Sequence, residues 1–149
     1  MENNIRDVLN TLLVDMFNQI LTLEETYIKE KGIKLSMSEI HTLEAIQKSK
    51  GKTMSEVAKR LRITQGTLTV NINRLTNKGY VYRVQDKKDR RIYRLKLTDK
   101  AESVLEIHDY FHSELIDQLI SKLSVDEKKL LADSLSQLNL YFKDLIKNL

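Results

Sequence analysis

The sequence has 149 residues, of which 41% are hydrophobic and 31% charged, a composition typical of a globular protein with one hydrophobic core. The absence of cysteine excludes disulfides, thiolate metal sites and cysteine nucleophiles. No apolar run is long enough to span a membrane, and Asp7 and Asp15 interrupt an N-terminal pattern that also lacks a signal peptide's basic start. We therefore expect a cytoplasmic protein that makes no membrane contact.

Charge is distributed unevenly along the chain. Residues 48–100 carry 16 Lys and Arg against 4 Asp and Glu, whereas the net charge of the whole chain is only +4. The two ends are therefore acidic and the middle is strongly basic. Such a separation indicates a middle region that binds a polyanion, and we expect nucleic acid.

The first half of the chain is predicted to be helical. Apolar residues recur at helical spacing from Ile5 to Lys31, and Gly32 is suited to end this helix. The stretches SMSE (residues 36–39) and TMSE (residues 53–56) are capping-box patterns, in which a hydroxyl and a glutamate satisfy the free amides of a first turn. Each therefore predicts the start of a further helix.

The period of the pattern then changes. A helix is expected from Thr64, as its cap, to Lys78. After it, apolar and polar residues alternate over 80–84 and again over 93–97, separated by a polar turn, which predicts a β-hairpin.

Two long helices are predicted at the end of the chain. Thr98 opens one that runs to about Leu123, and Ser124-x-x-Glu127 is a capping box that opens the last. The apolar stripes of the first and last helices are too extensive for the middle of the chain to cover. A second copy of the chain is the simplest partner, although an intramolecular three-helix bundle is the alternative.

The fold predicted from these elements is mainly α-helical with a small β-hairpin wing, a winged helix-turn-helix, in a single chain of residues 1–149. Residues 36–98 form the DNA-binding lobe. Residues 1–31 and 99–149 form the N- and C-terminal helices of a homodimer.

The turn Arg62–Thr64 joins two helices into a helix-turn-helix, a motif whose second helix lies in the DNA major groove. Leu68, Ile72 and Leu75 form the inward stripe of that helix. The remaining face and its flanks are predicted to contact bases through Gln65, Gly66, Thr67, Thr69, Val70, Asn73 and Arg74. The alternative interpretation is that these residues form a surface that only contacts solvent. Its methyl groups suit thymine, and its amides suit the N6/N7 edge of adenine, so we expect an A·T-rich operator.

The hairpin turn lies within DKKDRRIYRLKLT, residues 86–98. Lys87, Lys88 and Arg90 would repel one another there unless a polyanion were bound, and the minor groove of DNA offers a strong negative potential. Arg91 belongs to the same predicted DNA-binding set. Asp89 is expected to brace Arg91 or to cap the turn.

These motifs resemble those of a known family. The wing pattern D-x-R-x₃-L-x-L-T is matched at Asp89, Arg91, Leu95, Leu97 and Thr98, and it follows LTNKGYVYRV, which is similar to the family's L-x-x-K-G-hydrophobic segment. The chain resembles MarR-type transcriptional regulators over almost its whole length. This resemblance implies a two-fold dimer with interlocked terminal helices on double-stranded DNA that carries a pseudo-palindromic operator.

A narrower resemblance concerns FNQILTLEE, EIHTLEAI, TQGTLT and IHDYFH. These segments are similar to the FabT-like branch, which represses fatty-acid biosynthesis genes and uses acyl-acyl carrier protein as corepressor. The resemblance implies an effector pocket between the first, second and fifth helices, although each of its residues could equally be plain core. The implied pocket residues are Met16, Phe17, Ile20, His41, Leu43, His108, Phe111 and His112.

The three histidines admit two interpretations. His108 and His112 are four residues apart, a spacing that can chelate a metal. With Glu24 and His41 they resemble the first metal site of the family's zinc-responsive branch, but the acids of the second site are missing. We expect structural or ligand-positioning histidines with no metal and no cofactor, and a zinc-responsive regulator is the alternative. No nucleophile elbow, P-loop or dinucleotide motif is present, so no enzyme is predicted.

Overall fold

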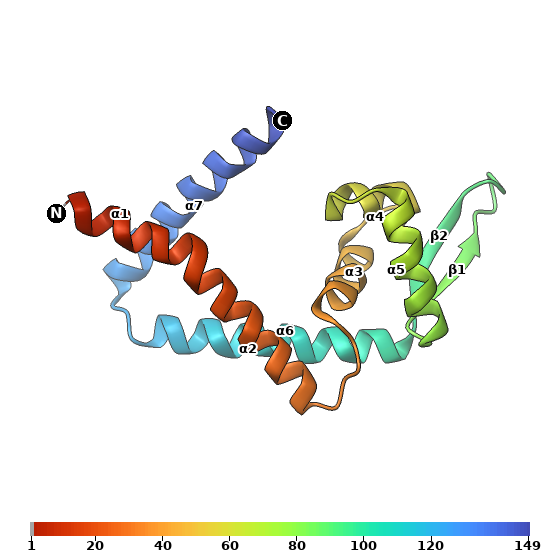
Figure 1. The fold of residues 1–149 in the computed structure, drawn as a ribbon, viewed down its shortest axis with the longest axis horizontal. Coiled ribbons are helices and arrows are strands. Elements are labelled where there is room, and N and C mark those ends of the chain that lie inside the picture. Colours follow the sequence, from red (N-terminus) through yellow and green to blue (C-terminus); the bar gives the residue numbers. More distant parts are fainter. Residues whose placement is uncertain (1) are drawn as a thin grey trace. The chain divides into compact units, whose positions relative to one another are not determined.

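A computed structural model describes the backbone of residues 2–149 and the side chains of residues 4–149. The chain forms two compact units, one that extends to Phe111 and one that spans His112–Leu149. The elements are α1 (Glu2–Thr11), the π-helix η1 (Leu12–Met16), α2 (Phe17–Glu30), α3 (Met37–Lys48), α4 (Met54–Leu61), α5 (Gln65–Asn77), β1 (Val81–Gln85), β2 (Tyr93–Leu97), α6 (Asp99–Ser121) and α7 (Val125–Lys147) (Figure 1). The boundary between the units lies within α6.

The predicted first helix is present but longer at its start and irregular in its middle. Helical backbone begins at Glu2, and η1 joins α1 to α2 as one turn of π-helix. Gly32 ends the helix in a left-handed conformation, with φ of 74°. A π-turn changes the hydrogen bonding of a few residues and leaves little trace in the spacing of apolar side chains, so the sequence pattern did not reveal it.

All three predicted capping boxes are confirmed. The hydroxyls of Ser36, Thr53 and Ser124 accept the backbone N–H three residues later at 3.2, 3.2 and 3.4 Å, and the glutamate of each box accepts the N–H of its capping residue. Thr64 caps α5 in the same way, because its hydroxyl accepts the N–H of Thr67 at 3.1 Å. Four helix starts are therefore determined by short local patterns.

The helix-turn-helix packs around one apolar core. Leu68, Ile72 and Leu75 of α5 are fully buried, as predicted, against a cluster that includes Ile46 of α3 and Val57 of α4. Helix α4 ends where Arg62 adopts a left-handed conformation, and the Ile63 N–H then donates to the Ala58 carbonyl at 3.1 Å. This closing turn sets the angle at which α5 leaves α4.

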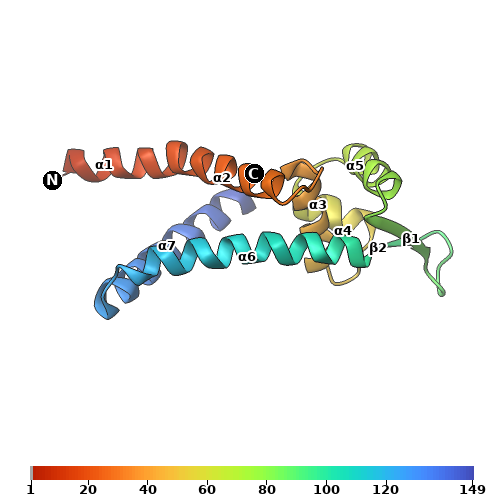
Figure 2. The ribbon, with the colours of Figure 1, turned by 90° about the horizontal axis from the view of Figure 1, so that it is seen from below.

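The hairpin is antiparallel, with Val81 opposite Leu97 and Gln85 opposite Tyr93. Its first strand begins at Val81, one residue later than predicted. The chain before α4 also joins the sheet, because the Leu95 N–H donates to the Lys52 carbonyl at 2.7 Å and Thr53 bridges to Arg94. No pattern in the sequence indicates this contact, which joins the base of the wing to the start of α4. In both views α5 lies beside the base of the hairpin (Figure 1, Figure 2).

The last two helices are close to the predicted ranges, although α6 ends at Ser121 and not near Leu123. The structure describes the whole of α7, and none of the residues of this helix is buried. Among the described residues, no helix is both long enough and apolar enough to cross a membrane.

An ion pair connects the first turn of α3 to the residue that follows α5. Lys78, just after α5, donates from Nζ to both carboxylate oxygens of Glu39 at 2.8 and 2.9 Å, and Glu39 also accepts the Ser36 N–H at 2.9 Å. Burial acts to raise the pKa of Glu39, but the hydrogen bonds from Lys78 and Ser36 outweigh it and hold the pKa below its ordinary value.

Replacing Glu39 with glutamine is expected to lower the free energy of unfolding by about 1 kcal/mol near neutral pH, because charge-assisted hydrogen bonds are roughly twice as strong as neutral ones. Since the folded-state pKa is lowered, the contribution of Glu39 is complete above the unfolded pKa near 4.5 and is lost as pH falls through the folded value. Urea unfolding at a series of pH values should show that the free energies of unfolding of wild type and Glu39→Gln become equal in acid.

Glu44→Gln is the matched control on the same helix. Glu44 pairs with the half-exposed Lys48 across one helical turn, an arrangement worth only about 0.3–0.5 kcal/mol. Equal losses of stability in the two variants would contradict a special role for Glu39.

Candidate nucleic-acid interface

The exposed face of α5 contains every residue that the sequence predicted to contact bases. All of them are exposed, with Thr67 and Thr69 on the flanks of the buried stripe: Gln65, Gly66, Thr67, Thr69, Val70, Asn73 and Arg74. The hydroxyl of Thr69 donates to the Gln65 carbonyl at 2.8 Å, and the hydroxyls of Thr64 and Thr67 are 2.9 Å apart. The helix thus takes the hydroxyl hydrogen of Thr69, which leaves its oxygen as an acceptor and its methyl group for contact with a base.

Gly66 is not required by the packing of the described residues. A Cβ atom there would meet the Thr64 hydroxyl at an ordinary 3.8 Å and nothing closer in the described part of the chain. Glycine in a helix costs about 1 kcal/mol relative to alanine. Close approach of DNA to the backbone is therefore the reason that we expect for glycine at this position.

One contact of this face was missed by sequence analysis. Arg83 of β1 donates from Nη2 to Oδ1 of Asn73 at 2.9 Å, which ties the wing to α5. Arg83 belongs to the alternating pattern of the strand, but nothing in that pattern shows that strand and helix meet at these two residues.

Asp86 organises the turn of the wing. Its Oδ1 accepts the N–H groups of Lys88 and Asp89 at 2.8 and 3.1 Å, and its Oδ2 accepts Nε of Arg94 at 2.7 Å. Arg94 also donates to the Gly51 carbonyl, which ties the turn to the loop before α4. The backbone N–H of Asp89, then Arg94 and the N–H of Lys88, lower the pKa of Asp86 to about 2.

The second acid of the wing, Asp89, fulfils both predicted roles. Its Oδ1 accepts the backbone N–H of Arg91 at 3.0 Å and Nε of the same arginine at 3.2 Å. Lys87, Lys88 and Arg90 are exposed at the tip. The acids thus hold the backbone of the turn and the flanking arginines, and the tip presents positive charge to solvent.

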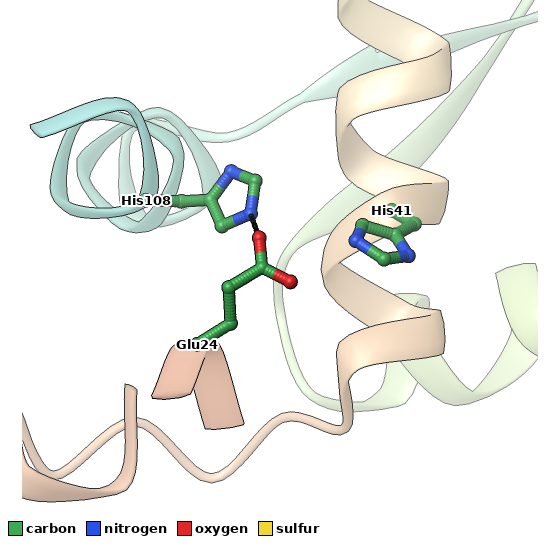
Figure 3. Close-up of side chains that lie close together, drawn as sticks. All are labelled: Glu24, His41 and His108. Carbon is green, nitrogen blue, oxygen red and sulfur yellow. Dashed lines mark hydrogen bonds and ion pairs between the residues drawn. The ribbon is translucent and has the colours of Figure 1, made fainter. Parts of the chain in front are cut away.

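A polar cluster lies away from α5 and the wing. Oε1 of Glu24 on α2 is 3.0 Å from Nε2 of His108 on α6, and both residues are almost fully buried (Figure 3). The ring of His41 on α3 lies 6.0 Å from that of His108. One ligand atom from each of the three residues falls within 4.8 Å of the others. The structure therefore brings together three of the four predicted metal ligands, and His112 belongs to the second unit.

This cluster has the right donors for zinc, but the ring centroid of His41 is 6.0 Å from that of His108, which is too far for both rings to bind one tetrahedral ion. Bonds of about 2.0–2.1 Å place tetrahedral ligand atoms roughly 3.3 Å apart. The pair of Glu24 and His108 meets this spacing at 3.0 Å, and His41 would have to move inward.

The residues implied for the effector pocket differ in burial. Leu43 and His108 lie in the core, and Phe111 packs on the ring of Tyr27 with centroids 5.1 Å apart. Ile20 is half-buried, whereas Met16 and Phe17 are 41% and 62% exposed. His41 lines an open pocket with Glu44, Ala45, Lys48, Arg60, Leu61 and Arg62.

Residues 31–92, from the end of the first helix to the wing, match the model of the MarR family. A regulator of Clostridium symbiosum, the HTH-type transcriptional regulator BilQ, is 31% identical over 112 residues, which cover 74% of this chain and 76% of BilQ. The chain belongs to the MarR family. MarR proteins are transcriptional regulators and not enzymes, and this member is accordingly a regulator that binds DNA.

Solved structures agree with the MarR assignment. Streptococcus pneumoniae FabT in complex with DNA superposes with a TM-score of 0.84 at 32% identity, covering 94% of this chain and 99% of FabT. The Staphylococcus aureus MepR–DNA complex has a TM-score of 0.70 at 21% identity, covering 89% and 95% of the two chains. The predicted winged helix-turn-helix is thereby confirmed as the MarR fold.

Replacing Asp86 with asparagine is expected to loosen the wing of this MarR protein and to weaken DNA binding roughly threefold or more, because an unanchored tip must be ordered on binding. Amide hydrogen exchange over residues 86–94 should accelerate, and thermal unfolding should change little. Asp99→Asn, at the start of α6, makes the same change in net charge outside the wing. Since removal of an acid by itself favours DNA binding, tighter binding by the Asp86 variant would contradict the role assigned to Asp86.

Proposed function

We propose that this MarR protein is a repressor that binds a pseudo-palindromic, A·T-rich operator as a homodimer, with α5 in the major groove and the wing tip in the minor groove. Residues 36–98 form the DNA-binding lobe, and residues 1–31 and 99–149 form the dimer. The observation that carries the proposal is a nearly uncharged exposed helix face beside a strongly cationic hairpin, in a chain similar to DNA-bound FabT.

The two surfaces suit different parts of a DNA duplex. The predicted base-contacting set on α5 contains one cation, Arg74, and is otherwise built from methyl, amide and backbone groups that suit base edges. The tip carries Lys87, Lys88 and Arg90 in the open. Phosphate contacts supply affinity and register, and base contacts supply sequence preference. Helix α5 would therefore determine sequence specificity, and the wing would contribute affinity.

Exposed apolar side chains support the homodimer. On the helix from α1 to α2 they include Ile5, Val8, Leu13, Val14 and Phe17, each more than half exposed. On α7 they include Leu130, Leu140 and Tyr141, also more than half exposed. Many large apolar side chains left in solvent on one helix are typical of an interface, and a second copy of the chain is the partner that we propose.

Replacing both Lys88 and Arg90 with alanine should weaken binding similarly on all DNA sequences and flatten its salt dependence. The logarithmic slope should fall by about 0.9 for each phosphate that the wing no longer neutralises. Fluorescence anisotropy titrations over a series of salt concentrations measure both quantities. The matched control, Lys143→Ala with Lys147→Ala on α7, removes the same charge outside the lobe. An unchanged slope in the wing variant would remove the wing from the interface.

We further propose that the regulated genes are those of fatty-acid biosynthesis, with acyl-acyl carrier protein as corepressor. The resemblance of four segments to the FabT-like branch and the similarity to FabT over nearly the whole chain support this. A pocket beside His41 adds a physical reason, although it lies on α3 and α4 and, of the residues implied for the effector pocket, His41 alone is in its lining. Ala45 and Leu61 give it apolar lining. Arg60, Arg62 and Lys48, the last of them paired with Glu44, give it cations, which suits an acyl chain on a phosphate-bearing arm.

A zinc-responsive regulator is the second candidate, favoured by the cluster of Glu24, His41 and His108. A carboxylate and two imidazoles form a common zinc ligand set. Zinc would draw His41 toward the buried pair and thus couple α2, α3 and α6.

Operator affinity measured with long-chain acyl-acyl carrier protein, with zinc, and with a chelator separates these candidates. The corepressor proposal predicts binding roughly tenfold tighter with the acylated carrier and unchanged with the unacylated carrier, zinc or chelator. An effect of zinc that disappears in Glu24→Gln would favour the metal candidate instead. If the acylated carrier leaves affinity unchanged, the corepressor proposal is wrong.

A further inference from the structure

The contact between Arg83 and Asn73 determines how the asparagine amide is oriented. Nη2 of Arg83 lies 2.9 Å from Oδ1 of Asn73. A guanidinium group has five N–H donors and no acceptor, so only the carbonyl end of an amide can satisfy it. The NH₂ end of Asn73 must therefore point away from Arg83, and the chemistry of the pair allows no flipped alternative at this distance.

This orientation changes what Asn73 can recognise. An asparagine reads adenine through both ends of its amide, because Oδ1 accepts from N6 and Nδ2 donates to N7. Arg83 occupies one of the two lone pairs of Oδ1, so the amide presents chiefly its NH₂ group, and the rest of the guanidinium adds further N–H groups beside it. The two exposed side chains together form a surface of donors.

We propose that Arg83 is a specificity-determining residue that sets Asn73 to favour a keto base, thymine or guanine, over the amino bases adenine and cytosine. In the major groove thymine presents the acceptor O4 and guanine presents O6 and N7. Adenine sets the donor N6 beside its one acceptor, N7, and cytosine presents the donor N4, so each amino base would place a donor against the donors of the pair. The inference rests on the proposed placement of α5 in the major groove, and it names the base class that one position of that helix selects.

The surroundings of Asn73 fit thymine in particular. Val70 lies one helical turn earlier on the same face and is 50% exposed. Its methyl groups suit the C5 methyl of thymine, which neighbours O4 on the same base edge. An A·T-rich operator therefore remains the expectation, but the base that Asn73 contacts is the thymine and not the adenine of the pair.

The pairing also prepares Asn73 before DNA arrives. An exposed asparagine samples several rotamers, and a side chain fixed in the free protein loses less entropy on binding. Arg83 lies on β1, so the wing that holds the phosphates would also hold a base-reading group of α5 in position.

The test compares wild type with Arg83→Met on a set of operator duplexes that carry each of the four base pairs at every position. Asn73→Ala first locates the position that Asn73 reads, as the one where its base preference is lost. At that position wild type should prefer keto to amino bases by about tenfold. In Arg83→Met the freed carbonyl can accept from N6, so the preference over adenine should fall to roughly twofold or less.

Lys87→Met is the matched control, since it removes one cation from the same hairpin at its tip. It should lower affinity evenly and leave the base preference unchanged. Asn73→Asp, which still pairs with Arg83 but has no NH₂ group, should lose the keto preference. If Arg83→Met lowers affinity evenly and keeps the keto preference, or if wild type prefers adenine, the inference is wrong. If Asn73→Ala lowers affinity evenly at all positions, the proposed base-reading role of α5 at this residue fails, and the inference fails with it.

Discussion

Burial of one apolar stripe decides which side of α5 meets the solvent. Leu68, Ile72 and Leu75 have no exposed surface. At roughly 25 cal/mol per Å² of apolar surface removed from water, rotating this helix to present any other face would cost several kcal/mol. The core around α5 and the chemistry of the exposed face of α5 are therefore two consequences of the same packing.

Hydrogen bonds and ion pairs, more than apolar packing, hold the turn of the wing in its conformation. A short hairpin with several adjacent cations is unfavourable by itself. Asp86 and Asp89 offset this by binding backbone N–H groups of the turn and the arginines that flank it, Arg91 and Arg94. The tip cations remain in solvent. The same charge that opposes folding of an isolated wing would favour its contact with a phosphate backbone.

The buried pair of Glu24 and His108 places a polar contact among the helices that adjoin the lobe. Its two residues come from α2 and α6, and His41 of α3 lies beside them (Figure 3). A buried carboxylate needs such a partner, because desolvation is costly without one. The pair thus joins α2 to α6 beside α3, the helix that precedes α4 and α5.

The sequence by itself determined the helix starts, the buried stripe of α5, the hairpin and the basic middle of the chain. Each of these features depends on residues that are close in sequence: a hydroxyl three positions before a glutamate, apolar side chains at helical spacing, alternating apolar and polar residues, or a run of lysine and arginine. Only the tertiary structure decided that Asp86 anchors Arg94, that Arg83 holds the carbonyl of Asn73, and that Glu24 meets His108 across 84 positions of sequence. The reason is that such contacts depend on the angles at which elements leave their turns, as at Arg62 with its left-handed backbone, and no local pattern of residue types encodes those angles.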